Sequence, residues 1–112
     1  MSAFYLIIDC GDKLSELCQE LSAWSQATFG TDQERGPVGP LKHLAKEVQE
    51  ALGKPDDIDE YADCLILVID AARRAGFKMI PLLEAAIRKI EVCKKRQWPK
   101  PSSDEPVEHV RI

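Results

Sequence analysis

Apolar side chains recur at intervals of three and four residues along most of the chain, and this periodicity is typical of amphipathic helices. The pattern predicts a first helix from Asp12, a residue type that caps helix N-termini, to about Phe29. Gly30 follows and is a natural stop. The inward stripe of this helix consists of Leu14, Leu17, Cys18, Leu21 and Trp24.

A second helix is predicted from Pro40 or Leu41 to Leu52, because proline is favoured in the first turn of a helix and Gly53 marks its end. Its inward face consists of Leu41, Leu44, Ala45 and Val48, with Leu52 as a further member. The preceding residues 31–40 hold two glycines and two prolines, so we expect a loop there that lies near a site.

A third helix is expected to follow an N-cap at Asp56 or Asp57 and to end at about Ala75, before Gly76. Residues 64–69 are apolar on every side of this helix, which predicts burial from several directions. Six apolar residues would also fit a buried strand. The absence of glycine and proline between residues 58 and 75 favours the helix.

A fourth helix is predicted from about Pro81 to about Trp98. Its inward residues are Leu82, Leu83, Ala86, Ile87, Ile90 and Cys93. Residues 99–112 are rich in proline and polar side chains and are expected to form a flexible tail. Residues 4–8 form a short apolar arm, which we expect to pack on the helices or on a neighbouring subunit, with a short strand as one option. The sequence therefore predicts an all-α fold with one four-helix domain over residues 1–98.

Composition and charge argue against several classes of protein. The 112 residues carry a formal net charge of −4, which argues against the binding of nucleic-acid phosphates as the main task. Every uninterrupted apolar stretch falls far short of the roughly 20 residues that cross a bilayer. The N-terminal apolar run has no preceding Lys or Arg and is broken by Asp9, so we expect a cytosolic protein without a signal peptide. The four cysteines form no CxxC pair and indicate neither a zinc finger nor a disulfide framework.

Two acidic pairs carry the clearest sign of chemistry. Glu47 with Glu50, and Glu60 with Asp63, each have the i,i+3 spacing that places two carboxylates on one helix face. If the second and third helices form an antiparallel hairpin, the two pairs face one another. Four converging carboxylates must then take up protons or bind cations. Oxygen ligands alone favour Mg²⁺ or Mn²⁺.

The same acidic residues also have structural interpretations. Glu60 stands three residues after Asp57 and fits the return arm of a capping box. Glu47 fits a solvated helix face that pairs with basic neighbours. Asp63 fits such a role less well, because it borders the most apolar run of the chain, where an unpaired carboxylate is costly.

Other charged residues complete the pattern. Asp70 lies two turns after Asp63 on about the same face, and we expect it to support the site or to pair with Arg73 or Arg74. The predicted fourth helix carries a basic cluster that either complements the helix dipole or reaches a bound phosphate. This cluster consists of Arg88, Lys89, Lys94, Lys95, Arg96 and Lys100.

The order of these motifs resembles a known superfamily. Glu47-x-x-Glu50, a short turn, Glu60-x-x-Asp63, then Lys89 and Arg96-Gln97-Trp98, is similar to the all-α nucleoside triphosphate pyrophosphohydrolases of the MazG-like superfamily. The Phe29-Gly30 loop and residues 39–44 and 70–76 resemble its dATP/dGTP diphosphohydrolase branch, the phage MazZ-like enzymes. The resemblance covers roughly residues 24–98.

The resemblance implies a Mg²⁺-dependent enzyme, with Mn²⁺ as the alternative metal, that cleaves a (deoxy)nucleoside triphosphate between its α and β phosphates. dATP and dGTP are the favoured substrates, and a nucleoside monophosphate and pyrophosphate are the products. The metal-binding and catalytic residues would be Glu47, Glu50, Glu60 and Asp63. The expected partners are the nucleotide and further copies of the chain, as a homodimer or homotetramer, with no nucleic acid and no membrane. The expected location is the cytoplasm of a bacterium or of a phage-infected host.

Substrate contacts are expected at Lys89 and Arg96 from the resemblance. Trp24 fits stacking on a purine and His43 fits contact with phosphate or base, although both also fit packing or a helix start. Compared with many relatives, this chain has Lys46 in place of an acidic residue. Cys93 likewise replaces an asparagine, and a thiol lacks the donor and acceptor pair of an amide.

Two other functions remain open from the sequence. One is a dUTP or dCTP pyrophosphatase of the same superfamily. The other is a helical oligomer without activity that acts as an adaptor.

Overall fold

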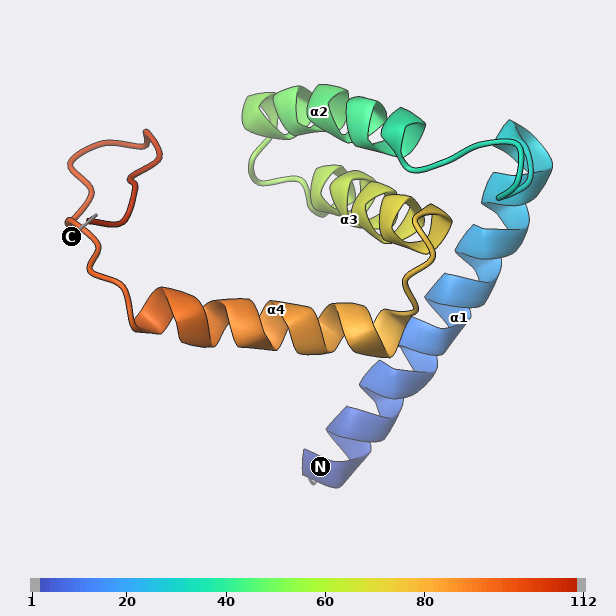
Figure 1. Ribbon diagram of the computed structural model, residues 1–112, viewed down its shortest axis with the longest axis horizontal. Helices are drawn as coiled ribbons and strands as arrows, with labels where there is room; N and C mark the ends of the chain where they lie inside the picture. The colour runs from blue at the N-terminus through green and yellow to red at the C-terminus, as the bar shows by residue number, and fades with distance from the viewer. Residues whose placement is uncertain (1–2, 111–112) are drawn as a thin grey trace. The chain divides into compact units, whose positions relative to one another are not determined.

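The computed structural model describes residues 3–110, with side chains from Cys10 onward, and over this range it contains α-helices and no strand (Figure 1). This confirms the all-α class. The chain divides into two compact units, Met1–Met79 and Ile80–Ile112. The first unit holds α1 (Ala3–Phe29), α2 (Val38–Gly53) and α3 (Ile58–Arg74), and α4 (Met79–Lys94) lies almost entirely in the second. Of the helices described, none combines the length and the apolar character that a membrane crossing requires.

The first helix ends where the sequence predicts and begins earlier. α1 stops at Phe29, and Gly30 follows with a φ of 109°, a conformation that favours glycine. The predicted start at Asp12 is wrong, because α1 already begins at Ala3 and continues through Gly11. A single glycine inside a helix costs only about 1 kcal/mol, which is too little to stop it. Residues 4–8 are therefore helical and not a strand. The expected packing of their side chains lies outside the part of the chain whose side chains the structure describes.

The α2–α3 hairpin forms as the sequence predicts, and its turn is held by short-range hydrogen bonds. α2 begins at Val38, two residues before the predicted start, with Pro40 in its first turn. Asp57 is the N-cap of α3, and its side chain accepts a hydrogen bond of 2.9 Å from the Asp59 amide. The Tyr61 hydroxyl donates to the Pro55 carbonyl at 2.8 Å. The two helices run antiparallel side by side (Figure 1).

The interior of the first unit contains charged groups as well as apolar ones. Its buried apolar residues are Leu21, Ile69 and Ala71, and its buried polar residues are Ser25, Glu60, Asp70 and Arg74. Because a buried charge requires partners, Asp70 and Arg74 are expected to be paired.

Asp70 and Arg74 form a cluster with Ser25 and Arg73. The Ser25 hydroxyl donates to Asp70 Oδ2 at 2.6 Å, and Arg73 Nη2 donates to Asp70 Oδ1 at 2.8 Å. Arg74 Nε lies 3.4 Å from Asp70 Oδ2. The predicted pairing of Asp70 with Arg73 or Arg74 is confirmed for both arginines.

The apolar run of α3 is less buried than the sequence predicts. Ile69 is 7% exposed, whereas Leu65 is 52% and Val68 41% exposed. The expectation that residues 64–69 are buried from several directions is therefore wrong for the single chain. One face of residues 64–69 packs against the rest of the first unit, and the opposite face is exposed to solvent.

In the second unit, α4 ends at Lys94 and not at about Trp98. Pro99 disfavours a helical backbone at the residue before it. The Trp98 indole instead donates to the Cys93 carbonyl at 2.8 Å, which satisfies one of the free carbonyls at the end of the helix.

The segment after α4 returns to its own start. The Val110 amide donates to the Gln97 carbonyl at 2.6 Å. The Trp98 and His109 rings meet edge to face with centroids 5.6 Å apart. A single domain over residues 1–98 with a flexible tail over 99–112 stays a prediction.

The Asp70 cluster predicts a specific response to acid. Burial raises the pKa of Asp70, but the hydrogen bonds from Ser25 and Arg73 and the charge of Arg73 outweigh this and hold the pKa below its ordinary value of 3.8. The ionised carboxylate thus stabilises the fold at pH values above 3.8, and this contribution is lost as the pH falls through the lowered pKa.

Asp70→Asn should therefore lower the free energy of unfolding at neutral pH by about 3 kcal/mol, because it leaves buried arginines without an acidic partner. The variant should also show a weaker pH dependence of stability below pH 4 or so than the wild-type protein. Urea unfolding followed by circular dichroism between neutral pH and about pH 3 measures both effects. Asp32→Asn, which removes a more exposed partner of Arg73, is the matched control and should have a smaller effect. Parallel pH profiles for Asp70→Asn and the wild-type protein would contradict this account.

Candidate functional site

Three of the predicted acidic residues converge between α2 and α3. One carboxylate oxygen from each of Glu47, Glu60 and Asp63 lies within 4.8 Å of the other two. Glu47 is on α2, and Glu60 and Asp63 are one turn apart on α3. The antiparallel hairpin brings these three carboxylates, which we call the acidic triad, to one place.

Three other predicted residues, Glu50, Lys89 and Arg96, are not members of the triad. Glu50 is on α2, has an exposed side chain and is not part of the group within 4.8 Å. Its charge is nevertheless close enough to raise the pKa of Glu60. Lys89 and Arg96 belong to the second unit, where both are exposed.

The triad contains buried oxygens that nothing in the described chain satisfies. Glu47 Oε2 and Glu60 Oε2 are buried and have no hydrogen-bond partner. Burial raises the pKa of Glu60, and the neighbouring charges of Glu50 and Asp63 raise it further, against the opposing effect of Lys54. Unpaired buried carboxylate oxygens are costly unless they bind a cation. The donor set consists only of oxygen, so it fits a hard divalent cation such as Mg²⁺ or Mn²⁺.

Neither structural interpretation of the acidic pairs accounts for these oxygens. Glu60 Oε2 has no partner, so the carboxylate is not consumed by a capping box. Glu47 pairs with a histidine, because His43 Nε2 and Glu47 Oε1 are 3.0 Å apart on successive turns of α2. A ring N–H at His43 Nε2 donates to this oxygen and orients the Glu47 carboxylate. That contact leaves Glu47 Oε2 available to another ligand.

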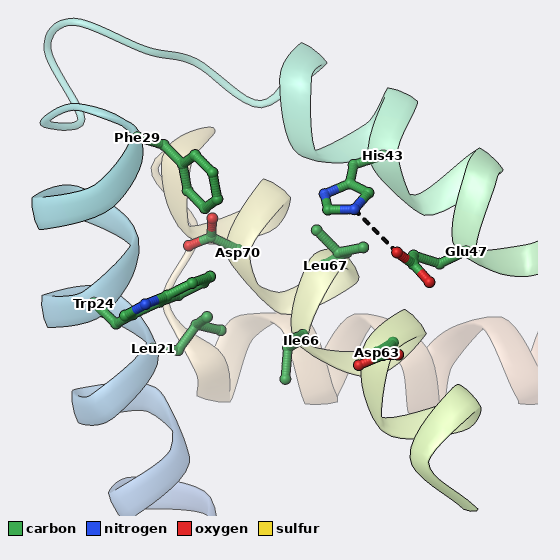
Figure 2. A pocket seen from close by; sticks show the side chains of 9 residues that line it. All are labelled: Leu21, Trp24, Phe29, His43, Glu47, Asp63, Ile66, Leu67 and Asp70. Carbon is green, nitrogen blue, oxygen red and sulfur yellow. Dashed lines mark hydrogen bonds and ion pairs between the residues drawn. The ribbon is translucent and has the colours of Figure 1, made fainter. Parts of the chain in front are cut away.

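A cavity of about 120 Å³ opens beside the triad (Figure 2). Glu47 and Asp63 lie at one end of it, close to His43. Trp24 and Phe29 lie at the other end, with their ring centroids 5.3 Å apart and their planes at 89° (Figure 2). The remaining lining residues are Leu21, Ile66, Leu67 and Asp70. The cavity thus joins an anionic end to an aromatic end.

Phe29 is a member of this cavity that the sequence does not predict. The sequence gives little indication of this role, because an aromatic residue before a glycine is typical of the end of a helix. In the structure its ring is 43% exposed, pairs with Trp24 and lies 5.5 Å from the Arg35 guanidinium carbon.

Comparison with known proteins supplies the family context. A family model described as dATP/dGTP pyrophosphohydrolase matches residues 17–112. The Eaa protein of Salmonella phage P22 is 46% identical over 93 residues, which are 83% of this chain and 28% of that protein. The chain therefore spans little more than a quarter of the length of that relative.

A solved structure has a similar fold. The cyanophage S-2L MazG-like pyrophosphohydrolase, bound to dGDP and three catalytic Mn²⁺ ions per active site, is 27% identical with a TM-score of 0.67. The similarity covers 87% of this chain and 92% of that one.

The repulsion within the triad predicts a stability change that depends on metal. Because the pKa of Glu60 is raised in the fold, ionisation of this group opposes folding once the pH rises through that pKa. Glu60→Gln should therefore raise the melting temperature in EDTA at neutral pH by a few degrees. Added Mn²⁺ should stabilise the wild-type protein more than the variant.

Differential scanning calorimetry with EDTA and with Mn²⁺ measures this difference. Glu50→Gln, which removes an exposed charge beside Glu60 and leaves the three triad carboxylates in place, should raise the melting temperature in EDTA by less. A Glu60→Gln protein that is less stable than the wild-type protein in EDTA would show that Glu60 is a structural residue.

Proposed function

The chain belongs to the dATP/dGTP pyrophosphohydrolase family, and from this premise we propose that it hydrolyses (deoxy)nucleoside triphosphates between the α and β phosphates. Water forms a bond to the α-phosphorus while the bond to the α–β bridging oxygen breaks, so that a nucleoside monophosphate and pyrophosphate are released. The observation that carries the proposal is the acidic triad, with its two unsatisfied buried oxygens, at one end of a cavity whose other end is aromatic.

We propose that Glu47, Glu60 and Asp63 hold Mg²⁺, with Mn²⁺ as the alternative, and that Glu50 completes the set from its position beside Glu60. A divalent metal at this place supplies Lewis-acid polarisation of phosphate oxygens and a bound water of lowered pKa. The oxygen-only donor set supports the choice of a hard cation, and the Mn²⁺ ions of the cyanophage relative support a divalent one. The contact from His43 keeps one Glu47 oxygen occupied and directs the other toward the cation.

The aromatic end of the cavity is the proposed place of the base. Trp24 lines the cavity and is 53% exposed, so its indole is accessible to a planar ligand. The family description and the dGDP in the cyanophage relative support a purine deoxynucleotide, dATP or dGTP. His43, which lines the cavity beside Glu47, is proposed to contact the phosphates or the base.

Lys89 and Arg96 are proposed to neutralise phosphate charge. Their support is the resemblance to the superfamily together with their exposure, which leaves both side chains available to a ligand. Lys89→Met and Arg96→Met should raise the KM for a triphosphate in steady-state assays, and an unchanged KM for both would remove these two residues from the site.

The decisive test is the release of pyrophosphate from each of the four dNTPs and four rNTPs, with Mg²⁺, with Mn²⁺ and with EDTA. We expect release that depends on metal and is fastest for dATP or dGTP. Asp63→Asn should lower kcat by at least about 100-fold while circular dichroism shows an unchanged helical fold. Asp59→Asn, one turn earlier on α3 and outside the triad, is the matched control and should retain activity.

Three outcomes would contradict parts of the proposal. Release of inorganic phosphate in place of pyrophosphate would exclude cleavage between the α and β phosphates. A preference for dUTP or dCTP would replace the purine assignment with the pyrimidine alternative. No release from any triphosphate by folded, metal-loaded protein would favour an adaptor without activity.

We also propose that the chain forms a homodimer or homotetramer. α3 carries an exposed apolar stripe at spacings of three, four and three residues, formed by Ile58, Tyr61, Leu65 and Val68. α4 carries one with the same spacings, formed by Ile80, Leu83, Ile87 and Ile90. Contiguous apolar surface of this kind is unusual on a monomer and typical of an interface.

Leu65→Glu should shift the protein toward the monomer, because it places a charge in the α3 stripe. Sedimentation velocity of the wild-type protein and the variant measures the change. Lys46→Glu, an exposed charge reversal on α2, is the control and should leave the mass unchanged. A wild-type protein that sediments as a monomer at micromolar concentration would contradict the proposal.

A further inference from the structure

Arg74 is a fully buried arginine whose guanidinium binds backbone carbonyls. Its side chain has no exposed surface, although the residue is on the last turn of α3. Nη2 donates to the carbonyls of Ser25 and Gly30 at 3.1 and 2.9 Å, and also to the Ser25 hydroxyl at 2.9 Å. Nη1 donates to the carbonyls of Thr31 and Arg35 at 3.3 and 3.0 Å. Asp70 beside it compensates the positive charge.

The carbonyls that Arg74 binds adjoin the aromatic end of the cavity. Trp24 directly precedes Ser25, and Phe29 directly precedes Gly30. The Arg35 side chain lies over the Phe29 ring, with the guanidinium carbon 5.5 Å from the ring centroid. Arg74 itself is not among the residues that line the cavity. It contacts the cavity lining through the Asp70 carboxylate, which Arg73 also binds, and reaches Trp24 and Phe29 through the backbone that it holds.

We infer that Arg74 is a positioning residue for nucleotide binding, which fixes Trp24 and Phe29 through the carbonyls next to them. This inference rests on the proposed function, because it takes the aromatic end of the cavity as the place of the base. A guanidinium suits the task, since its planar fork reaches carbonyls from two separate stretches of backbone at once. A lysine at the same position would keep the charge opposite Asp70 but would lose the fork.

Arg73 provides a contrast on the same turn of α3. It donates to Asp70 and forms two hydrogen bonds of 2.6 and 2.7 Å with the Asp32 carboxylate. The hydrogen bonds of Arg73 reach the carboxylates of Asp70 and Asp32, whereas those of Arg74 also reach the carbonyls beside Trp24 and Phe29. Arg73→Lys thus perturbs the same charge cluster without releasing the aromatic end.

The test compares Arg74→Lys, Arg73→Lys and the wild-type protein in two measurements. Steady-state pyrophosphate release from dATP and dGTP gives KM and kcat, and electron paramagnetic resonance gives the affinity for Mn²⁺ without nucleotide. Arg74→Lys should raise KM by about 10-fold or more, with kcat within about threefold of the wild-type value. Its Mn²⁺ affinity should stay unchanged, because the acidic triad is untouched. Arg73→Lys should change KM by less than about threefold.

A second variant keeps the inference testable if Arg74→Lys does not fold. Gly30→Ala strains the same turn from outside the charge cluster, since its φ of 109° is unfavourable for residues with a Cβ atom. It should raise KM in the same way and leave the Mn²⁺ affinity unchanged.

The outcomes separate the inference from the function on which it rests. A wild-type protein that releases no pyrophosphate contradicts the proposed function and with it the inference. Wild-type activity together with the same KM in Arg74→Lys and Arg73→Lys overturns the inference alone. A loss of Mn²⁺ affinity in Arg74→Lys also overturns it, because the residue would then support the whole fold and not the aromatic end.

Discussion

The buried pairing of Arg74 with Asp70 is the contact on which the first unit depends. Few apolar residues are buried there, so hydrophobic burial alone does little to define where α1 meets α3. The arginine makes that meeting specific, because it binds the end of α1 and the loop that follows it. A buried charge that loses its partner is costly, so alternative packings of these segments are strongly disfavoured.

The hairpin of α2 and α3 solves the opposite problem. It gathers like charges, which favours binding of a cation and opposes folding without one. The hairpin tolerates this repulsion because short-range hydrogen bonds stabilise its turn. These are the bond from the Asp59 amide to the Asp57 cap and the bond from the Tyr61 hydroxyl to the Pro55 carbonyl. Glu60 of the triad is on the first turn of α3, so these turn contacts directly adjoin the site. The turn contacts hold the two helix ends together although the carboxylates of the triad repel one another.

Much of this arrangement could be predicted from the sequence, and what could not depends on contacts distant along the chain. Asp57 and the glycines at 53 and 76 mark helix ends through local chemistry, and the i,i+3 spacing of the acids follows from helix geometry. The early start of α1 was not predictable, because an aspartate that resembles a cap does not show whether the helix continues before it. The early end of α4 depends on an indole that reaches back to Cys93. Phe29 became a cavity residue only through its packing against Trp24, and the outward placement of Glu50 depends on how the two helices are rotated against each other.

α3 carries both the acids of the triad and the Asp70–Arg74 pair on one continuous stretch of helix. Each inserted or deleted residue between Asp63 and Asp70 would rotate one group against the other by about 100° and shift it by about 1.5 Å. Either change would separate the triad from the cavity or would draw the arginine away from the loop. The length of this segment is therefore fixed by the two groups at its ends. Among related sequences, changes of length should accumulate in the loops and termini, and the length of α3 should stay constant.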